Sequence, residues 1–283
     1  MGAPECFTGR ASAAGLYWAL THASGSGSEA IQRLKNEDAM TADFITALQR
    51  EVENAQDLLG AGTTVAIGHI FQHLRPALKE VSVGADLLMV VSGDGLVPRG
   101  GVRLLWIQFK QAEAGSPIGL NVYRKPNAAG RTQLEALRAV HSTTVGSFGV
   151  YALASDAYTF FAATIVNKLG HVVPSVASTC KINLGEEGVR FQEVVLALAS
   201  DTNCGEFTTS TEVVQFVDAL AAERSIIPLT VLGVSSGREL VSGRDLVQLI
   251  KASWEERLRE HRQRLRNDNP LQIERDDGSS MDR

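Results

Sequence analysis

Two short apolar runs between residues 84 and 110 carry the clearest pattern of hydrophobic and polar positions in the chain. They occupy residues 84–91 and 103–110, and both are rich in branched side chains and bounded by turn-forming residues. This pattern predicts two buried strands joined by a hairpin-like loop. Side chains alternate between the two faces along a strand, so Gln108 and Lys110 share one face and Phe109 takes the other.

Before and after this strand pair in the sequence, apolar residues recur at the three- and four-residue spacing of a helix. Residues 1–30 instead predict a flexible segment, because they contain a Ser-Gly tract at 24–28, although the apolar patch at 16–18 is expected to dock on the body. We expect helices at residues 29–59, 132–140, 157–169, 210–224 and 245–267, further strands at 63–70, 148–154 and 226–234, an apolar segment of unsettled type at 191–199 and a disordered tail from 269.

Composition and charge narrow the class of protein. The 283 residues are 44% hydrophobic, enough for a sizeable core, and the net charge of -5 excludes a strongly basic surface. Contacts to nucleic acid would therefore need a local cluster, and the best candidate is Tyr123, Arg124 and Lys125. Three widely spaced cysteines support neither a disulfide framework nor a zinc site, and the sequence has no membrane span or signal pattern, so a cytoplasmic location is expected.

An acid in an apolar strand is costly to bury without a counter-ion or a metal. Asp86 in the first run, followed by Gln108-Phe109-Lys110 in the second, resembles the PD-(D/E)XK nuclease superfamily in its QxK variant. The resemblance implies that Asp86, Gln108 and the main-chain carbonyl of Phe109 hold Mg²⁺ or Mn²⁺. It also implies that Lys110 orients the attacking water. Gln108 stands where the commonest pattern has an acid, which leaves the site one negative charge short.

Two further residues are candidates through the same resemblance. Members of the superfamily often bring a Glu from an early helix to the metal, which points to Glu37, with Asp38 as the alternative. Acids at a helix start are also explained by the helix dipole alone. Gln133 occupies the place of a residue that often faces the active site from the helix after the QxK strand.

The resemblance implies an α/β fold, namely a restriction-endonuclease-like core with a mixed central sheet flanked by helices. That core covers residues 31–170, and a C-terminal α/β extension covers 171–268. The implied function is a metal-dependent endonuclease that hydrolyses phosphodiester bonds in DNA. Such a protein can serve as an effector in bacterial antiphage defence, with a sensor subunit or a second copy of the chain as a protein partner.

Two other readings stay open. One is a nuclease-like fold that has lost catalysis and serves as a nucleic-acid-binding or scaffold subunit, which Gln108 and the acidic net charge favour. The other is a nucleotide-binding kinase, because residues 92–95 resemble the glycine-rich loop of lipid kinases. A single glycine motif is weak support for that function.

Overall fold

The structure is a computed structural model of the 283-residue chain. It describes residues 11–34, 37–59, 63–70, 84–93, 96–97, 101–111, 118–120, 133–142, 146–154, 162–165, 180–182, 189–200 and 229–236, with single positions between 209 and 263. Its helices are α1 (Ala11–Leu34), α2 (Glu37–Leu59), α3 (Gln133–Ser142) and α5 (Phe191–Ser200). Its strands are β1 (Thr63–Ile70), β2 (Leu87–Gly93), β3 (Val102–Gln111), β4 (Ile118–Leu120), β5 (Ser147–Ala154), β6 (Ala162–Ile165), β7 (Cys180–Ile182), β8 (Val189–Arg190) and β9 (Leu229–Ser236).

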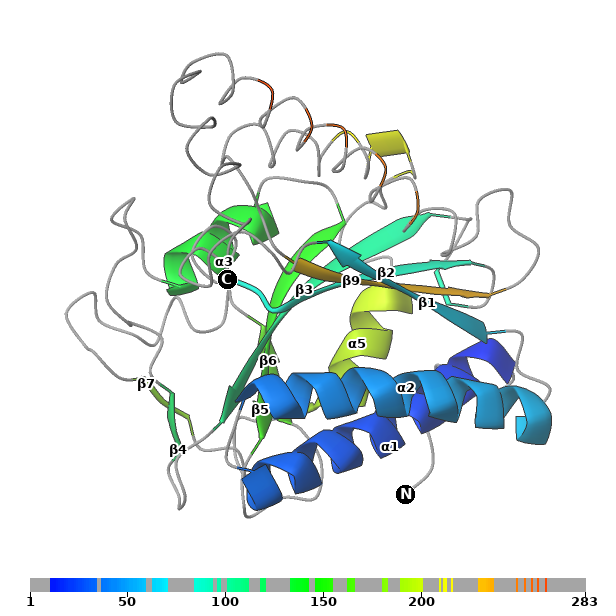
Figure 1. Cartoon of the computed structure of the whole chain (residues 1–283), viewed down its shortest axis with the longest axis horizontal. Helices are drawn as coiled ribbons and strands as arrows, with labels where there is room; N and C mark the ends of the chain where they lie inside the picture. The colour runs from blue at the N-terminus through cyan, green and yellow to red at the C-terminus, as the bar shows by residue number, and fades with distance from the viewer. Residues whose placement is uncertain are drawn as a thin grey trace, which may run out of the picture.

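The described strands form a seven-stranded mixed sheet and a separate two-stranded sheet (Figure 1). The larger sheet has the order β1-β9-β2-β3-β5-β6-β8, and β4 pairs with β7 in the smaller one. The predicted hairpin is present, because β2 and β3 are antiparallel and place Leu87 opposite Ile107. Both β9 beside β2 and β5 beside β3 run parallel to their neighbours. The fold is therefore α/β with a mixed central sheet, as the sequence predicts.

Strands from both sides of the boundary predicted at residue 170 belong to the larger sheet. β9 lies between β1 and β2, next to the edge strand of the larger sheet, although its residues come 136 positions after the end of β2 (229 − 93). β8 extends the far side of the same sheet, and α5 supplies side chains to the same hydrophobic core. An apolar strand can satisfy its hydrogen-bonding groups beside any strand that leaves an edge open, so the position of β9 in the sheet could not be predicted from its position in the sequence.

α1, α2 and α5 cover one face of the sheet, and three phenylalanines join the layers there. Phe109 of β3 lies with its ring 5.3 Å from that of Phe44 on α2 and 6.5 Å from that of Phe191 on α5. The rings of Phe44 and Phe191 are 5.6 Å apart in an edge-on arrangement. All three side chains are completely buried. Because Phe109 is anchored on this face, its neighbours on β3 must point to the other face.

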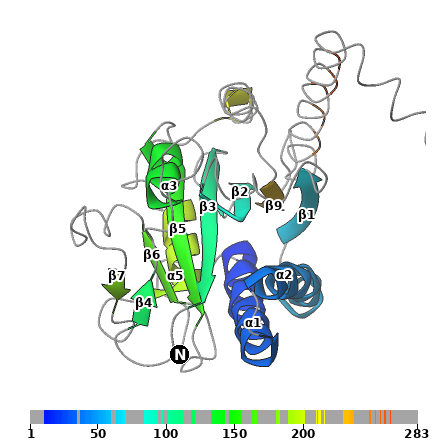
Figure 2. The same cartoon turned by 60° about the vertical axis from the view of Figure 1, so that its left-hand side comes forward.

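α3 packs on that opposite face, against β3 and β5. Figure 2 shows α3 beside β5, with α1 and α2 on the far side of the strands. The predicted inward residues of this helix, Leu134 and Leu137, are buried. Both faces of β3 are therefore covered, and every residue from 102 to 110 is buried.

The flexible segment predicted for residues 1–30 is wrong over the part that the structure describes, because α1 begins at Ala11 and includes the whole Ser-Gly tract. Ser24 and Ser28 are buried, and the Ser24 hydroxyl donates a 2.6 Å hydrogen bond to the carbonyl of Leu20. Small residues allow α1 and α2 to approach closely, which offsets their weak helix propensity. Within the apolar patch, Leu16 docks in the core as expected, whereas Trp18 is 41% exposed and stacks beside His22.

Two further segments differ from expectation. The helix predicted at 157–169 is wrong in its middle, because residues 162–165 form β6, paired antiparallel with β5. Pairing with an available strand edge outweighs the weak helical pattern of this short run. The unsettled segment at 191–199 is a helix, α5. The strands predicted at 63–70, 148–154 and 226–234 are confirmed where described, with β9 running from 229 to 236.

A capping box begins the helix predicted near residue 210. The Thr209 hydroxyl accepts a hydrogen bond from the amide of Glu212 at 3.2 Å, and the Glu212 carboxylate accepts one from the amide of Thr209 at 2.7 Å. This reciprocal pair satisfies donors that a helix start leaves open, so the sequence signal for a capped helix is confirmed there.

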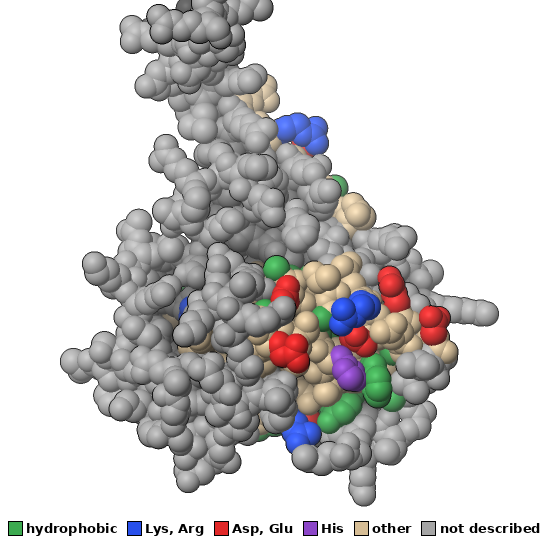
Figure 3. All heavy atoms as spheres, turned by 60° about the horizontal axis from the view of Figure 1, so that its bottom comes forward, with side chains coloured by type: hydrophobic (Ala, Val, Ile, Leu, Met, Phe, Trp, Pro, Cys, Tyr) green, Lys and Arg blue, Asp and Glu red, His purple; other side chains and the backbone are tan. Residues whose placement is uncertain are grey.

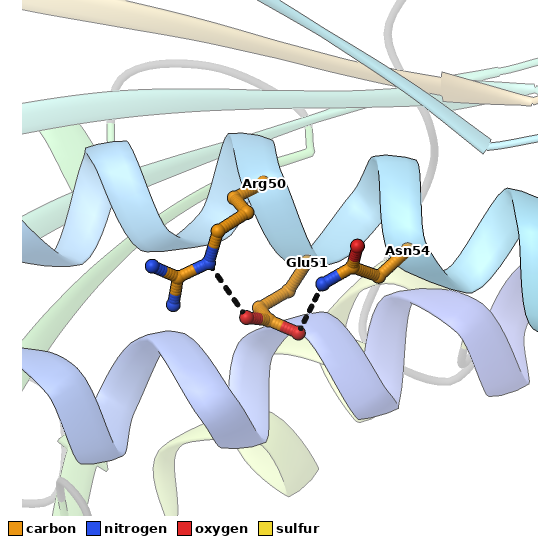
Figure 4. A network of polar contacts seen from close by, with 3 residues as sticks. All are labelled: Arg50, Glu51 and Asn54. Carbon is orange, nitrogen blue, oxygen red and sulfur yellow. Dashed lines mark hydrogen bonds and ion pairs between the residues drawn. The ribbon is translucent and has the colours of Figure 1, made fainter.

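A buried carboxylate on α2, Glu51, is held by two neighbours on the same helix (Figure 4). Arg50 donates from Nε to Oε1 at 3.0 Å, and Asn54 donates from Nδ2 to Oε2 at 3.1 Å. Burial by itself raises the pKa of Glu51, but the two hydrogen bonds and the charges of Arg50 and His22 outweigh it and leave the pKa below its usual 4.5.

We expect Glu51 to stabilise the fold in a pH-dependent way. Since its folded pKa lies below its unfolded one, its contribution to the free energy of unfolding is complete above the unfolded value of 4.5 and is lost as the pH falls through the folded value. The melting temperature of Glu51→Gln should therefore be lower than that of wild type at pH 7, and this difference should disappear below about pH 4. Glu53→Gln, at an exposed position on the same helix, is the control. A gap that stays constant from pH 7 to pH 3 would contradict this account.

Candidate active site

Asp86 is placed by the turn that leads into β2. Gly84 adopts a left-handed conformation with φ of 69°, which a residue with a Cβ reaches only at a cost. The amide of Asp86 then donates to the carbonyl of Ile107 at 2.9 Å. This bond continues the β2–β3 ladder by one residue and sets Asp86 beside Gln108. The two residues singled out from sequence, 22 positions apart, are thus neighbours in space.

The Asp86 carboxylate and the Gln108 amide are in direct contact. Gln108 Nε2 donates to Asp86 Oδ2 at 2.6 Å and also to the main-chain carbonyl of Phe109 at 3.0 Å. The amide of Phe109 donates to the same Asp86 oxygen at 2.9 Å. Oδ2 therefore accepts one side-chain and one main-chain donor, which fixes the carboxylate against the end of β3. The Asp86 side chain is partly buried and Gln108 is fully buried.

Lys110 lies on the same face of β3 as Gln108, two residues further along the strand. Only 5% of the residue is exposed, so the ammonium group sits at the margin of a largely dry region. Desolvation strengthens its interaction with any anion that enters, such as a phosphate. Gln108 and Lys110 do not project into solvent, because α3 and the neighbouring strands cover this face.

The register of the sheet adds residues that the sequence pattern did not single out. Tyr151 of β5 is directly beside Gln108 and completely buried. Trp106, two residues before Gln108, donates from its indole nitrogen to the Ser147 hydroxyl at 2.8 Å. The strand containing Tyr151 was predicted, but its register against β3 was not, and only the register brings the tyrosine to the site.

Glu37 and Gln133 are the first residues of α2 and α3, which lie on opposite faces of the sheet. α3 is on the side of Gln108 and Lys110, and α2 is on the side of Phe109. The side chains of Glu37 and Gln133 lie outside the part that the structure describes, as does all of Asp38 beyond its place in α2. The predicted nucleic-acid contacts Tyr123, Arg124 and Lys125 also fall outside the described ranges.

The chemistry of the donors tests whether the site suits a divalent cation. The Asp86 carboxylate and the Phe109 carbonyl are hard oxygen ligands of the kind Mg²⁺ and Mn²⁺ prefer. Gln108 instead presents its NH₂ group to both oxygens, and an NH₂ group cannot bind a cation. Reversing the amide would set its oxygen against two other oxygens, which is favourable only with a cation between them. Asp86 and Phe109 therefore fit a metal as they stand, and Gln108 fits it only after turning.

Among the described residues, no group of three or more His, Cys, Asp or Glu side chains could together hold a metal ion. Nor does any described helix combine the length and the apolar character needed to cross a membrane. Compared with known proteins, the chain matches no family model and no curated protein.

Proposed function

We propose that this chain is a metal-dependent nuclease that hydrolyses phosphodiester bonds in DNA, built on a restriction-endonuclease-like core. One observation supports the proposal most strongly. The Asp86 carboxylate from the start of β2 contacts Gln108 on β3, and Lys110 follows on the same face of that strand. An acid, an amide and a buried lysine at one end of a central sheet provide the charges that phosphodiester hydrolysis requires.

Each group has a role that follows from its position. Asp86 and the Phe109 carbonyl would hold Mg²⁺ or Mn²⁺, and Glu37 is a further proposed ligand. Such an ion neutralises charge on the scissile phosphate and makes a bound water more acidic. Lys110 donates hydrogen bonds to the attacking water or to a phosphate oxygen, and its dry surroundings strengthen that contact. The amide of Phe109 fixes the Asp86 oxygen, so the carboxylate needs little reorganisation when substrate arrives.

The charge on the molecule favours approach of a polyanion from the side of Lys110. Figure 3 shows acidic side chains, with basic ones among them, on the face turned toward the viewer. Among the described residues of α1 and α2, Glu29, Glu53 and Asp57 are exposed acids. Arg50 is the basic residue exposed among them in α2. In the described part of these two helices, exposed acids outnumber exposed bases, which disfavours contact of a phosphate backbone with them and supports entry on the opposite face of the sheet. Tyr123, Arg124 and Lys125 are the proposed backbone contacts.

A second candidate function is a nuclease-like subunit that binds nucleic acid without cleaving it. The orientation of Gln108 favours it, because the amide donates hydrogen bonds to the oxygens that would bind a metal and adds no negative charge to the site. In either form, we propose that the chain works beside a sensor subunit in defence against phage.

The two candidates separate in one assay. Purified chain is incubated with supercoiled plasmid in the presence of Mg²⁺ or Mn²⁺, with a chelator added in parallel samples. The nuclease proposal expects nicked or linear DNA that appears only without chelator. Retarded but uncut DNA at millimolar metal would support the binding subunit instead and would overturn the nuclease.

A further inference from the structure

Gln108 contacts two oxygens that a metal would also use. Its NH₂ group lies 2.6 Å from Asp86 Oδ2 and 3.0 Å from the carbonyl of Phe109. An amide NH₂ group between two oxygen acceptors presents partial positive charge to them, on the side where a bound cation would present its full charge. In this geometry the amide competes with a cation for these two oxygens, whereas the sequence predicts that Gln108 is itself a ligand of the cation.

We propose that Gln108 is a latch that holds Asp86 away from divalent cations until substrate is bound. This inference rests on the proposed nuclease function, since it concerns cation binding at the same site. Mg²⁺ sites in phosphoryl-transfer enzymes commonly combine one or two carboxylates with oxygens of the substrate phosphate. The ligands added by substrate offset the hydrogen bonds that Gln108 gives up, so the ion is held only when a phosphodiester is present.

The two views of Gln108 predict opposite signs for the same substitution. As a ligand, Gln108 contributes an oxygen, and removing it weakens cation binding. As a latch, it donates a charge-assisted hydrogen bond that a cation must first displace. Loss of such a bond corresponds to roughly a tenfold to hundredfold change in an equilibrium constant. Replacing the amide by an apolar side chain of similar size should therefore tighten cation binding.

The test measures Mn²⁺ binding to the full chain without nucleic acid, by the paramagnetic resonance signal of the free ion. Gln108→Leu should lower the Kd for Mn²⁺ by about tenfold or more relative to wild type. Gln111→Leu, the same change at the end of the same strand, serves as the matched control and should leave the Kd unchanged. Addition of an uncleavable phosphorothioate oligonucleotide should tighten Mn²⁺ binding in wild type far more than in Gln108→Leu.

The outcomes distinguish the latch proposal from the nuclease proposal on which it rests. Weaker Mn²⁺ binding in Gln108→Leu, with binding abolished in Asp86→Asn, overturns the latch and leaves the nuclease proposal standing. Absence of Mn²⁺ binding in every variant, with and without oligonucleotide, overturns both.

Should Gln108→Leu melt below the assay temperature, Gln108→Met keeps the length of the side chain and carries the same expectation. The wild-type chain provides a further readout. The side-chain NH₂ resonance of Gln108 should shift when Mg²⁺ and oligonucleotide are added together and stay in place with Mg²⁺ alone. A shift with Mg²⁺ alone overturns the latch.

Discussion

Asp86→Asn and Lys110→Met should each slow plasmid cleavage by about three orders of magnitude while leaving the fold intact. Asparagine keeps the shape of Asp86 and an oxygen that can accept from the Phe109 amide, but it removes the negative charge that holds a cation. Methionine keeps the apolar stem of Lys110 and removes the ammonium group. Asp86→Asn acts by weakening the site for the cation, whereas Lys110→Met removes a positive charge that is needed chiefly when charge develops on the phosphate, so both changes lower the rate of cleavage.

The measurement is the initial rate of nicking at saturating Mg²⁺, together with the melting temperature of each variant. Gln111→Leu is again the matched control, since it alters β3 one position beyond Lys110 and should cleave at the wild-type rate. Cleavage by Asp86→Asn or Lys110→Met within a few fold of wild type, in folded protein, would remove these residues from the mechanism and the nuclease proposal with them.

Phe109→Ala should lower the free energy of unfolding by about 3–5 kcal/mol. The side chain is completely buried and touches Phe44 from α2 and Phe191 from α5, so its removal opens a cavity where two helices meet the sheet. Loss of the aromatic pairs adds to the loss of buried area. Because the space left by alanine is bounded by two other packed rings, the neighbouring side chains can move little to refill it.

Urea unfolding followed by tryptophan fluorescence checks the value. Phe109→Leu retains most of the volume and should lose clearly less stability than alanine. A loss below about 1 kcal/mol for alanine would show that the three phenylalanines do not form the junction described here. Since the anchoring of Phe109 also sets the face on which Gln108 and Lys110 lie, the alanine variant should weaken cleavage even where it remains folded.

The sequence predicts β2 and β3 correctly, but it does not predict the helix α1 along the Ser-Gly tract or the strand β6. Side chains alternate between the two faces of a strand. Once residues 103–110 are predicted as a strand, backbone geometry alone therefore determines which side chains of β3 share a face. The Ser-Gly tract of α1 misled because small residues have low helix propensity, while their value for close helix packing depends on a partner helix. The strand β6 was missed for a related reason, since its pairing with β5 is a tertiary contact.

One part of the candidate site likewise follows from the sequence, and another part does not. That Asp86 and Gln108 meet follows from two adjacent antiparallel strands, and the sequence supplies both strands and the spacing between the residues. Which end of the Gln108 amide faces Asp86 does not follow from sequence, because it depends on the main-chain carbonyl and the carboxylate that surround it. Tyr151 likewise enters only through the register of β5.

The place of β9 between β1 and β2 has a consequence for how the chain folds during synthesis. β1 and β2 end 159 (229 − 70) and 136 (229 − 93) residues before the start of the strand that pairs with both of them, so their backbone groups on that side cannot form these hydrogen bonds until residues 229–236 are made. An apolar strand edge exposed for that long is prone to pair with other chains. A fragment that stops at residue 170 would keep the proposed catalytic residues but would lack the strand that pairs with β1 and β2. We therefore expect the smallest unit that folds by itself to extend through β9.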